Sequence, residues 1–311
     1  MKNTMKKIIT AIVILMLSTS VYPQDDITDL VATYLAAKLH QDSIDVSDFV
    51  VVYKYTCKTF DADNKPVTDS IRLALQVSNN GSRFYPYYKY LEDTQGVDYF
   101  TPENYQLVKS EAFCHIPEVW MDYKVRKQTV RDIIAPNHYE TCEDITWLST
   151  TPTWTVWERD TVTIKGYLCK TARCLFHGQG WTARYTEEIP ICAGPWKLGG
   201  LPGLILDAES RDGIHRFSIE SLSNVKTTIY YEHNAITQKI SDEKLIKQRN
   251  RIFGNKQYPN NPIYYITDIQ SLNSTANVIY YGCFGDDKEI GLIINGAFIG
   301  DKAHVYQPLE K

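Results

Sequence analysis

The chain has 311 residues, a formal net charge of −4 and 43% hydrophobic residues, with 22 Tyr and 6 Trp. Such a composition is typical of a folded, β-rich protein and excludes a disordered chain. An acidic chain without a basic run also argues against nucleic acid as a partner.

Residues 1–24 have the pattern of a secretory signal peptide. Three lysines precede an apolar run over residues 8–17, which is too short to span a bilayer. The first cysteine is Cys57, so no amino-terminal lipid anchor is expected, and no later apolar stretch is long enough to span a membrane. We therefore expect a periplasmic or secreted protein that does not span the membrane, with residues 25–311 forming one β-rich domain.

An amphipathic helix is predicted over 27–40, because Leu30, Tyr34 and Leu35 fall on one helical stripe. Further helices are predicted over 101–113 and 241–251. Apolar or aromatic runs separated by turn residues predict strands at 49–57, 71–77, 84–90, 124–134, 154–158, 161–166, 167–176, 181–187, 204–208 and 215–220, and apolar segments follow at 278–282 and 290–294.

These strands follow one another through connections too short for parallel crossovers, which need about a dozen residues. The fold class predicted is therefore mainly β: a long, curved antiparallel sheet over residues 49–220 with a few packed helices. A long sheet leaves a hollow on its concave side, and the helix over 27–40 is expected to fill it.

The segment over 189–206 is the most specific feature of the chain. In Leu201-Pro202-Gly203-Leu204, Pro in the second position and Gly in the third predict a type II turn, with φ > 0 at Gly203. Because a strand follows and the glycine spacing fits neither a Walker loop nor a dinucleotide fingerprint, a structural corner is favoured over a phosphate site. The corner consists of Gly200, Leu201, Pro202, Gly203, Leu204 and Ile205.

The string Gly-Leu-Pro-Gly-Leu-Ile over 200–205 resembles the motif of the GLPGLI family, uncharacterised exported proteins of Bacteroidota. Blocks over 164–172, 178–190 and 306–310 are similar to other parts of the family pattern, although Gln179 and Arg184 replace its usual Arg and Trp. The resemblance implies an exported protein and a possible association with outer-membrane transport systems. The expected half-barrel over helices is also similar to LolA-like envelope proteins.

All seven cysteines follow the predicted signal peptide. An odd number leaves at least one free thiol, and an oxidising compartment favours at least one disulfide. Connectivity does not follow from the sequence, but Cys114 and Cys142 flank the middle segment and are the preferred pair.

No serine-hydrolase or zincin motif occurs, so no catalytic residue and no cofactor are predicted. Cys114 and His115 are not expected to form a catalytic thiol–imidazole pair, because neighbours on a strand point to opposite faces. Four soft ligands lie close together in the sequence: Cys169, Cys174, His177 and Cys192. Such a set would suit Cu(I) or zinc, but its spacing matches no known zinc motif, so no metal site is predicted. Four acidic residues are expected to form a solvated edge: Glu187, Glu188, Asp207 and Glu209.

Three aromatic residues near the corner, Trp181, Tyr185 and Trp196, could line a ligand groove, with core packing as the alternative. The sequence thus favours a non-catalytic envelope protein that binds a small ligand or an envelope protein. Two alternatives remain open: an accessory partner of an outer-membrane transport complex, and an enzyme whose site is assembled from distant residues.

Overall fold

A computed structural model describes residues 41–61, 63–97, 116–135, 138–144, 151–232, 238–254, 263–266, 278–281, 289–294, 297–302, 304–305 and 307–311. The predicted signal peptide, the predicted helices over 27–40 and 101–113, and Cys114 and Cys283 lie outside these residues. Within the described part of the chain, no helix combines the length and the apolar character needed to cross a bilayer.

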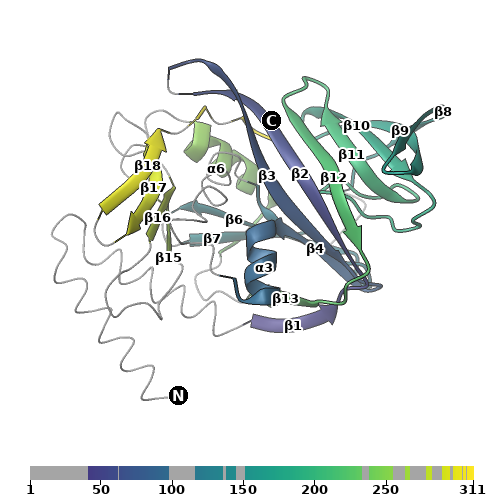
Figure 1. Ribbon diagram of the computed structural model, residues 1–311, viewed down its shortest axis with the longest axis horizontal. Coiled ribbons are helices and arrows are strands. Elements are labelled where there is room, and N and C mark those ends of the chain that lie inside the picture. The colour runs from purple at the N-terminus through teal and green to yellow at the C-terminus, as the bar shows by residue number, and fades with distance from the viewer. Residues whose placement is uncertain are drawn as a thin grey trace.

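The main sheet has 12 strands (Figure 1). They are β2 (Phe49–Phe60), β3 (Pro66–Val77), β4 (Gly81–Pro86), β5 (Glu118–Asp122), β6 (Lys127–Ala135), β7 (His138–Asp144), β8 (Thr155–Ile164), β9 (Tyr167–Phe176), β10 (Gln179–Thr186), β11 (Leu204–Ser210), β12 (His215–Ser223) and β14 (Gln238–Ile240). Their spatial order is β14-β7-β6-β5-β4-β3-β2-β12-β11-β10-β9-β8.

Two smaller sheets and two helices complete the described elements. β1 (Gln41–Val46) pairs with β13 (Thr228–Glu232), and a four-stranded sheet contains β15 (Ile263–Ile266), β16 (Val278–Tyr281), β17 (Glu289–Ile294) and β18 (Ala297–Lys302). The helices are α3 (Tyr87–Gln95) and α6 (Asp242–Gly254).

Pairing of β2 with β12 joins two antiparallel meanders into the main sheet. From this central pair the chain order runs outward, from β2 to β7 on one side and from β12 back to β8 on the other. Neighbouring strands are antiparallel except β14 and β7, which are parallel. The prediction of a mainly β fold with one long, curved antiparallel sheet over 49–220 is therefore confirmed. The sheet is open, because β14 and β8 are its two edges.

Two-residue turns set the hairpins at the β8 edge. Lys165 and Gly166 have φ of 52° and 90°, and His177 and Gly178 have φ of 47° and 76°. Positive φ at both central residues is the signature of a type I′ turn, whose twist matches that of the flanking strands. The segments predicted as two strands over 154–158 and 161–166 are one strand, β8, with a bulge between Trp157 and Thr161.

The strand predicted over 84–90 is wrong beyond Pro86, where β4 ends and α3 begins. Tyr88 and Tyr90 are buried on this helix, and Tyr90 packs with Val50 and Tyr85 in a small second core. Aromatic residues favour strands in general, but this packing overrides the local preference. The predicted strand over 124–134 likewise begins later, at Lys127, after a turn that follows β5.

The face of the main sheet that bears Tyr53, Tyr55 and Phe217 is called the inner face. It packs against the connection between β10 and β11, against α6 and against residues 307–311; these segments contribute Trp196, Leu198, Leu201, Leu245 and Leu309 to the main hydrophobic core. The described chain therefore fills the inner face with segments that follow the strands, and the helix predicted for this role over 27–40 lies outside it.

Among the described residues, the opposite, outer face is covered over one meander only. α3 packs against β3 and β4 (Figure 1). The β1–β13 pair lies beside β3 and β5, because Trp120 Nε1 donates to Tyr230 O at 3.1 Å and Gln76 Nε2 donates to Thr228 O at 3.0 Å. Over the other meander, outer-face side chains such as Arg173 and Arg216 are exposed. The two halves of this face thus differ in their access to solvent.

Candidate functional site

The connection between β10 and β11, residues 189–203, folds over the inner face and is called the corner. Leu198 N–H donates to Pro195 O at 3.0 Å, which closes a turn. Trp196 and Gly200 have φ of 54° and 87°. A non-glycine residue in this region costs about 1–3 kcal/mol, so Trp196 must be held there by the packing around it.

Gly203 does not have the positive φ predicted for it. Among the glycines of the corner, Gly200 is the one with a positive φ. The predicted type II turn is therefore wrong. Gly203 N–H instead donates to Leu201 O at 2.8 Å, and a Cβ atom at Gly203 would lie 2.0 Å from Thr186 O. Glycine is required at 203 because the backbone passes close to the end of β10.

The corner directs Lys197 into the protein. Its side chain is 0% exposed, and Nζ donates to Asp242 Oδ1 and to Glu310 Oε1, each at 2.6 Å. Burial alone would lower the pKa of Lys197, but Glu310 and Asp242 raise it above its usual value. The ammonium group therefore remains charged in the interior, where its two carboxylate partners offset the loss of water.

Helix α6 supplies the next groups. Ser241 caps it, accepting a hydrogen bond at Oγ from Lys244 N–H at 3.3 Å, and this places Asp242 in the first turn. Two turns later, Arg249 donates from Nη1 to Asp132 Oδ2 at 3.2 Å and from Nη2 to Glu310 Oε2. The helix thus presents one anion and one cation to the same buried site.

Glu310 is the centre of this arrangement, with a side chain that is 0% exposed. Burial would raise the pKa of Glu310, but Lys197 and Arg249 lower it to about 2. Asn250 Nδ2 also donates to Glu310 O at 2.8 Å, so the backbone of the segment is held as well. Residues 307–311 are thereby fixed to both the corner and α6.

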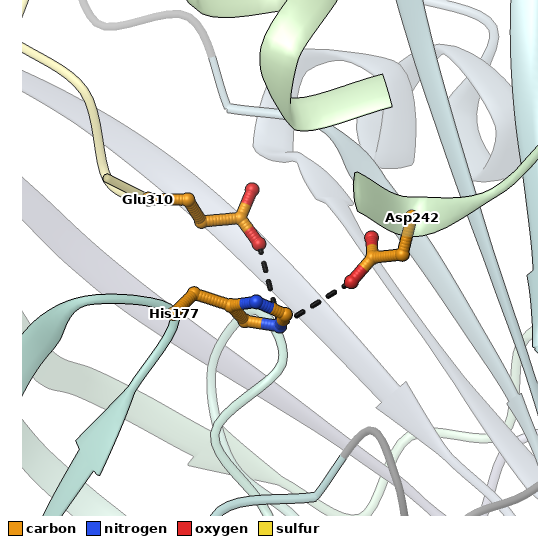
Figure 2. A group of neighbouring side chains, drawn as sticks. All are labelled: His177, Asp242 and Glu310. Carbon is orange, nitrogen blue, oxygen red and sulfur yellow. Dashed lines mark ion pairs between the residues drawn. The ribbon is translucent and has the colours of Figure 1, made fainter. Parts of the chain in front are cut away.

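His177 contributes an imidazole from the turn between β9 and β10 (Figure 2). Its Nε2 lies 3.3 Å from Asp242 Oδ2 and 3.7 Å from Glu310 Oε1. Burial and the neighbouring Lys197 lower the pKa of His177 below its usual value, so the ring is neutral at pH 7. The whole group is called the ionic cluster: Asp132, His177, Lys197, Asp242, Arg249 and Glu310.

A metal ion is a natural hypothesis for part of this cluster. Among the described residues, one group offers three possible metal ligands close together: the ligand atoms of His177, Asp242 and Glu310 lie within 4.8 Å of one another. However, the Lys197 ammonium already contacts both carboxylates at 2.6 Å, and a metal ion would have to displace it. The donor set therefore fits an internal ion-pair network better than a metal centre.

The cysteines near the corner do not join His177 in this group. Cys57, Cys169, Cys174 and Cys192 are free thiols. Burial raises the pKa of Cys169 to about 11 and that of Cys174 to about 12, so these two thiols are protonated and unreactive at neutral pH. The preferred disulfide between Cys114 and Cys142 stays a prediction, because Cys114 lies outside the described residues.

The three aromatic residues proposed for a groove are all buried: Trp181 and Tyr185 are 1% exposed and Trp196 is 2% exposed. The structure brings together Trp181 and Trp196, whose ring centroids are 5.7 Å apart. Trp196 lines a cavity that has room for about one water molecule (about 10 Å³) and also borders Tyr123 and Cys192. The other two pack in the core.

The acidic residues considered for a solvated edge occupy different positions. Glu187 pairs with Lys170 at 3.0 Å and is 47% exposed, whereas Asp207 is 4% exposed. Asp207 accepts hydrogen bonds from Arg184 Nη1 and from Arg216 Nε, the latter at 2.8 Å. These carboxylates are neutralised by cations, so they do not form a pair suited to acid–base catalysis.

Sequence reasoning missed the ionic cluster. Lys197 and Glu310 are 113 residues apart, and charged residues near turns are normally exposed. The available signal was their apolar surroundings, in Trp196-Lys197-Leu198 just before the GLPGLI-like string and in Pro308-Leu309-Glu310 within the block over 306–310. A charge surrounded by apolar neighbours in a specific block is a candidate for burial.

A family described as "Protein of unknown function (Porph_ging)" matches residues 176–207, which contain His177, β10, the corner and the start of β11. No curated protein matches this chain. Two structures of PNGF-II, in space groups P21 and C2, are similar at 12% identity and a TM-score of 0.40; they cover 81% and 78% of this chain. The chain spans only 36% and 40% of the length of those structures.

Proposed function

We propose that this protein is an exported, non-catalytic binding component of the bacterial envelope, related to the GLPGLI-type proteins of Bacteroidota. The amino-terminal pattern of lysines followed by a short apolar run supports export. The family match over 176–207 covers the region around the corner but carries no activity with it.

One observation carries the non-catalytic part of the proposal: the groups best suited to chemistry neutralise one another in the interior. Lys197 and Glu310 have side chains that are 0% exposed and are paired at 2.6 Å. A catalytic residue has to reach a substrate, whereas these groups fasten the corner, α6 and residues 307–311 together. The chemistry of the cluster therefore serves folding.

The partner in this proposal is a small ligand or another envelope protein. Attachment to an outer-membrane transport complex is a narrower form of the same proposal and is implied by the family resemblance. An enzyme with a site assembled from distant residues is the competing hypothesis, and His177 is the group of the ionic cluster that such a site would use, because its side chain is 22% exposed.

Native mass spectrometry of the protein isolated from its own cells tests the proposal. We expect the protein in the envelope or outside the cell, without residues 1–24, and bound to a ligand or partner that is recovered chemically unchanged. A mass of all 311 residues in the cytosol would contradict export. Conversion of the bound compound by the native protein, but not by a His177→Gln variant, would contradict the non-catalytic assignment.

A further inference from the structure

A row of cationic side chains crosses the open half of the outer face and continues onto β2 and β3, where the Arg72 guanidinium lies 5.3 Å from the ring centroid of Tyr87 on α3. Strand register places Arg184 opposite Asp207, Asp207 opposite Ser218, and Ser218 opposite Lys54. Opposed residues on antiparallel strands project from the same face of the sheet. Five cations of this face are called the outer stripe: Arg173, Arg184, Arg216, Lys54 and Arg72.

The stripe extends over six neighbouring strands, from β9 through β10, β11, β12 and β2 to β3. At about 4.8 Å between strands, its ends are about 24 Å apart. Arg173 lies opposite Thr182 at one end, and Arg72 lies opposite Lys54 at the other. A surface of this length fits an extended polymer rather than a compact small molecule.

The charge of the stripe is opposite to that of the chain. Four of its five cations are exposed, and the two carboxylates beside them are Asp207 and Glu209. The chain as a whole has a formal net charge of −4. A locally positive face on an acidic protein attracts an anionic partner to that face and orients it there.

Hydroxyl groups alternate with these cations. The same registers place Thr182, Ser218, Thr56 and Ser70 between or beside the charged residues. At the β8 end, Trp157 is 40% exposed, and the Arg173 guanidinium lies 4.6 Å from its ring centroid. Hydroxyl donors and acceptors together with a flat aromatic face suit the hydroxyl groups and ring faces of sugars.

The stripe already binds a carboxylate of the protein itself. Asp207 receives Arg184 on Oδ1 and Arg216 on Oδ2, so the two guanidinium groups approach one carboxylate from both sides. Planar guanidinium groups match the geometry of carboxylates. Lys54 is exposed on β2, where its paired residues on the neighbouring strands are Ser218 and Arg72.

We propose that the outer stripe binds an extended polysaccharide that carries carboxylate groups, an inference that rests on the proposed role as a binding protein. The carboxylates of the polymer contact Lys54, Arg72 and Arg173, while its hydroxyl groups contact the Ser and Thr side chains between them. Binding weakens as the ionic strength rises, because the contacts are exposed charges.

Calorimetric titration of the whole chain with polygalacturonate in low-salt buffer tests this proposal. The variant Lys54→Glu/Arg173→Glu should bind at least about tenfold more weakly, since it turns two charge-assisted contacts into repulsions. Glu209→Gln removes a carboxylate beside Arg216 and should bind about two- to fivefold more tightly. A gain of affinity cannot result from misfolding, so this second variant keeps the test decisive.

A matched control changes charge equally elsewhere: Lys226→Glu/Lys247→Glu alters two exposed lysines on the β12–β13 connection and on α6, and it should bind like the native protein. Equal binding of neutral dextran, equal loss in the control, or binding only to phosphatidylserine vesicles would overturn the proposal. If native mass spectrometry finds a different ligand while charge reversal has no effect, the stripe assignment fails and the binding function stands.

Discussion

The ionic cluster of the inner face and the Arg184–Asp207–Arg216 group of the outer face use the same chemistry in different surroundings. Lys197 and Glu310 are 0% exposed, whereas Arg216 is 51% exposed. In the interior, a charge that loses its partner cannot be solvated, while at the surface water replaces the partner. A charge of the inner cluster therefore depends on its partner, whereas Arg216 on the outer face can be solvated without its partner.

The corner links the two regions. It connects β10, which carries Arg184, to β11, which carries Asp207, and it sends Lys197 to the opposite face. The buried pairs thus hold the connection that keeps these two strands in register. We infer that damage inside the protein disturbs the outer face, whereas changes on the outer face leave the interior intact.

The largest effect is expected for Lys197→Met. The side chain keeps much of its volume, but Asp242 and Glu310 lose the ammonium group that each contacts at 2.6 Å. Removing one partner of a buried pair costs about 3–5 kcal/mol. Urea unfolding should show this loss, and Lys197→Met/Glu310→Leu should recover part of it. A loss below about 1 kcal/mol would place Lys197 in the same class as a surface cation.

His215 and Arg216 are neighbours on β12 that face inward and outward, so they allow a direct comparison. His215 Nδ1 accepts from Tyr55 OH at 2.7 Å, and Nε2 donates to Pro308 O at 3.2 Å, which fixes a neutral ring. Burial lowers the pKa of His215 from 6.5 to about 4. This group should make stability strongly pH-dependent, whereas Arg216 should not.

The direction follows from proton binding. Between about pH 6.5 and pH 4 the unfolded chain binds a proton at His215 and the folded protein does not, so stability falls as the pH falls. Because of His215, the folded protein is about 3 kcal/mol more stable above pH 6.5, the pKa in the unfolded chain, than below about pH 4. In His215→Gln, the free energy of unfolding should change less with pH across this window. An unchanged pH slope in that variant would show that other groups dominate.

The next effect, about 1–3 kcal/mol, is expected for Gly203→Ala, because the added Cβ meets Thr186 O at 2.0 Å and the corner must shift. Gly166→Ala is the matched control: its φ is 90° but nothing lies within 4 Å of the added atom, so it measures backbone strain alone. Thermal melts measure the stability of both variants. In a separate titration, polygalacturonate should bind more weakly only to Gly203→Ala. Equal behaviour of the two would break the link between corner and outer face.

Much of the sheet could be predicted because its signals are local. Alternating burial along β2 and β12 and the turn residues between strands define both the elements and their antiparallel order. The single predicted sheet contained both β2 and β12, but their pairing was not predicted, because nothing in the sequence links residues 57 and 215. Non-local pairing depends on the whole core.

The site could be predicted only in part for the same reason. The corner was identified from Pro and Gly, which act on their own backbone, but the reason for Gly203 was wrong because Thr186 approaches it from another strand. Lys197 was missed because its partners come from α6 and from residues 307–311. Local signals gave the position of the corner, and long-range contacts determine what it does.

The smallest effect is expected for Arg216→Gln on the outer face. Arg216 is 51% exposed and Asp207 keeps Arg184 as a partner, so the free energy of unfolding should fall by about 1 kcal/mol or less. In about 1 M NaCl this loss should disappear, because screening removes exposed pairs, while the loss in Lys197→Met should persist. Paired unfolding curves at low and high salt measure both. A loss above about 2 kcal/mol, or one insensitive to salt, would mean that Asp207 belongs energetically to the interior and that the outer face is not free to exchange its partners for a ligand.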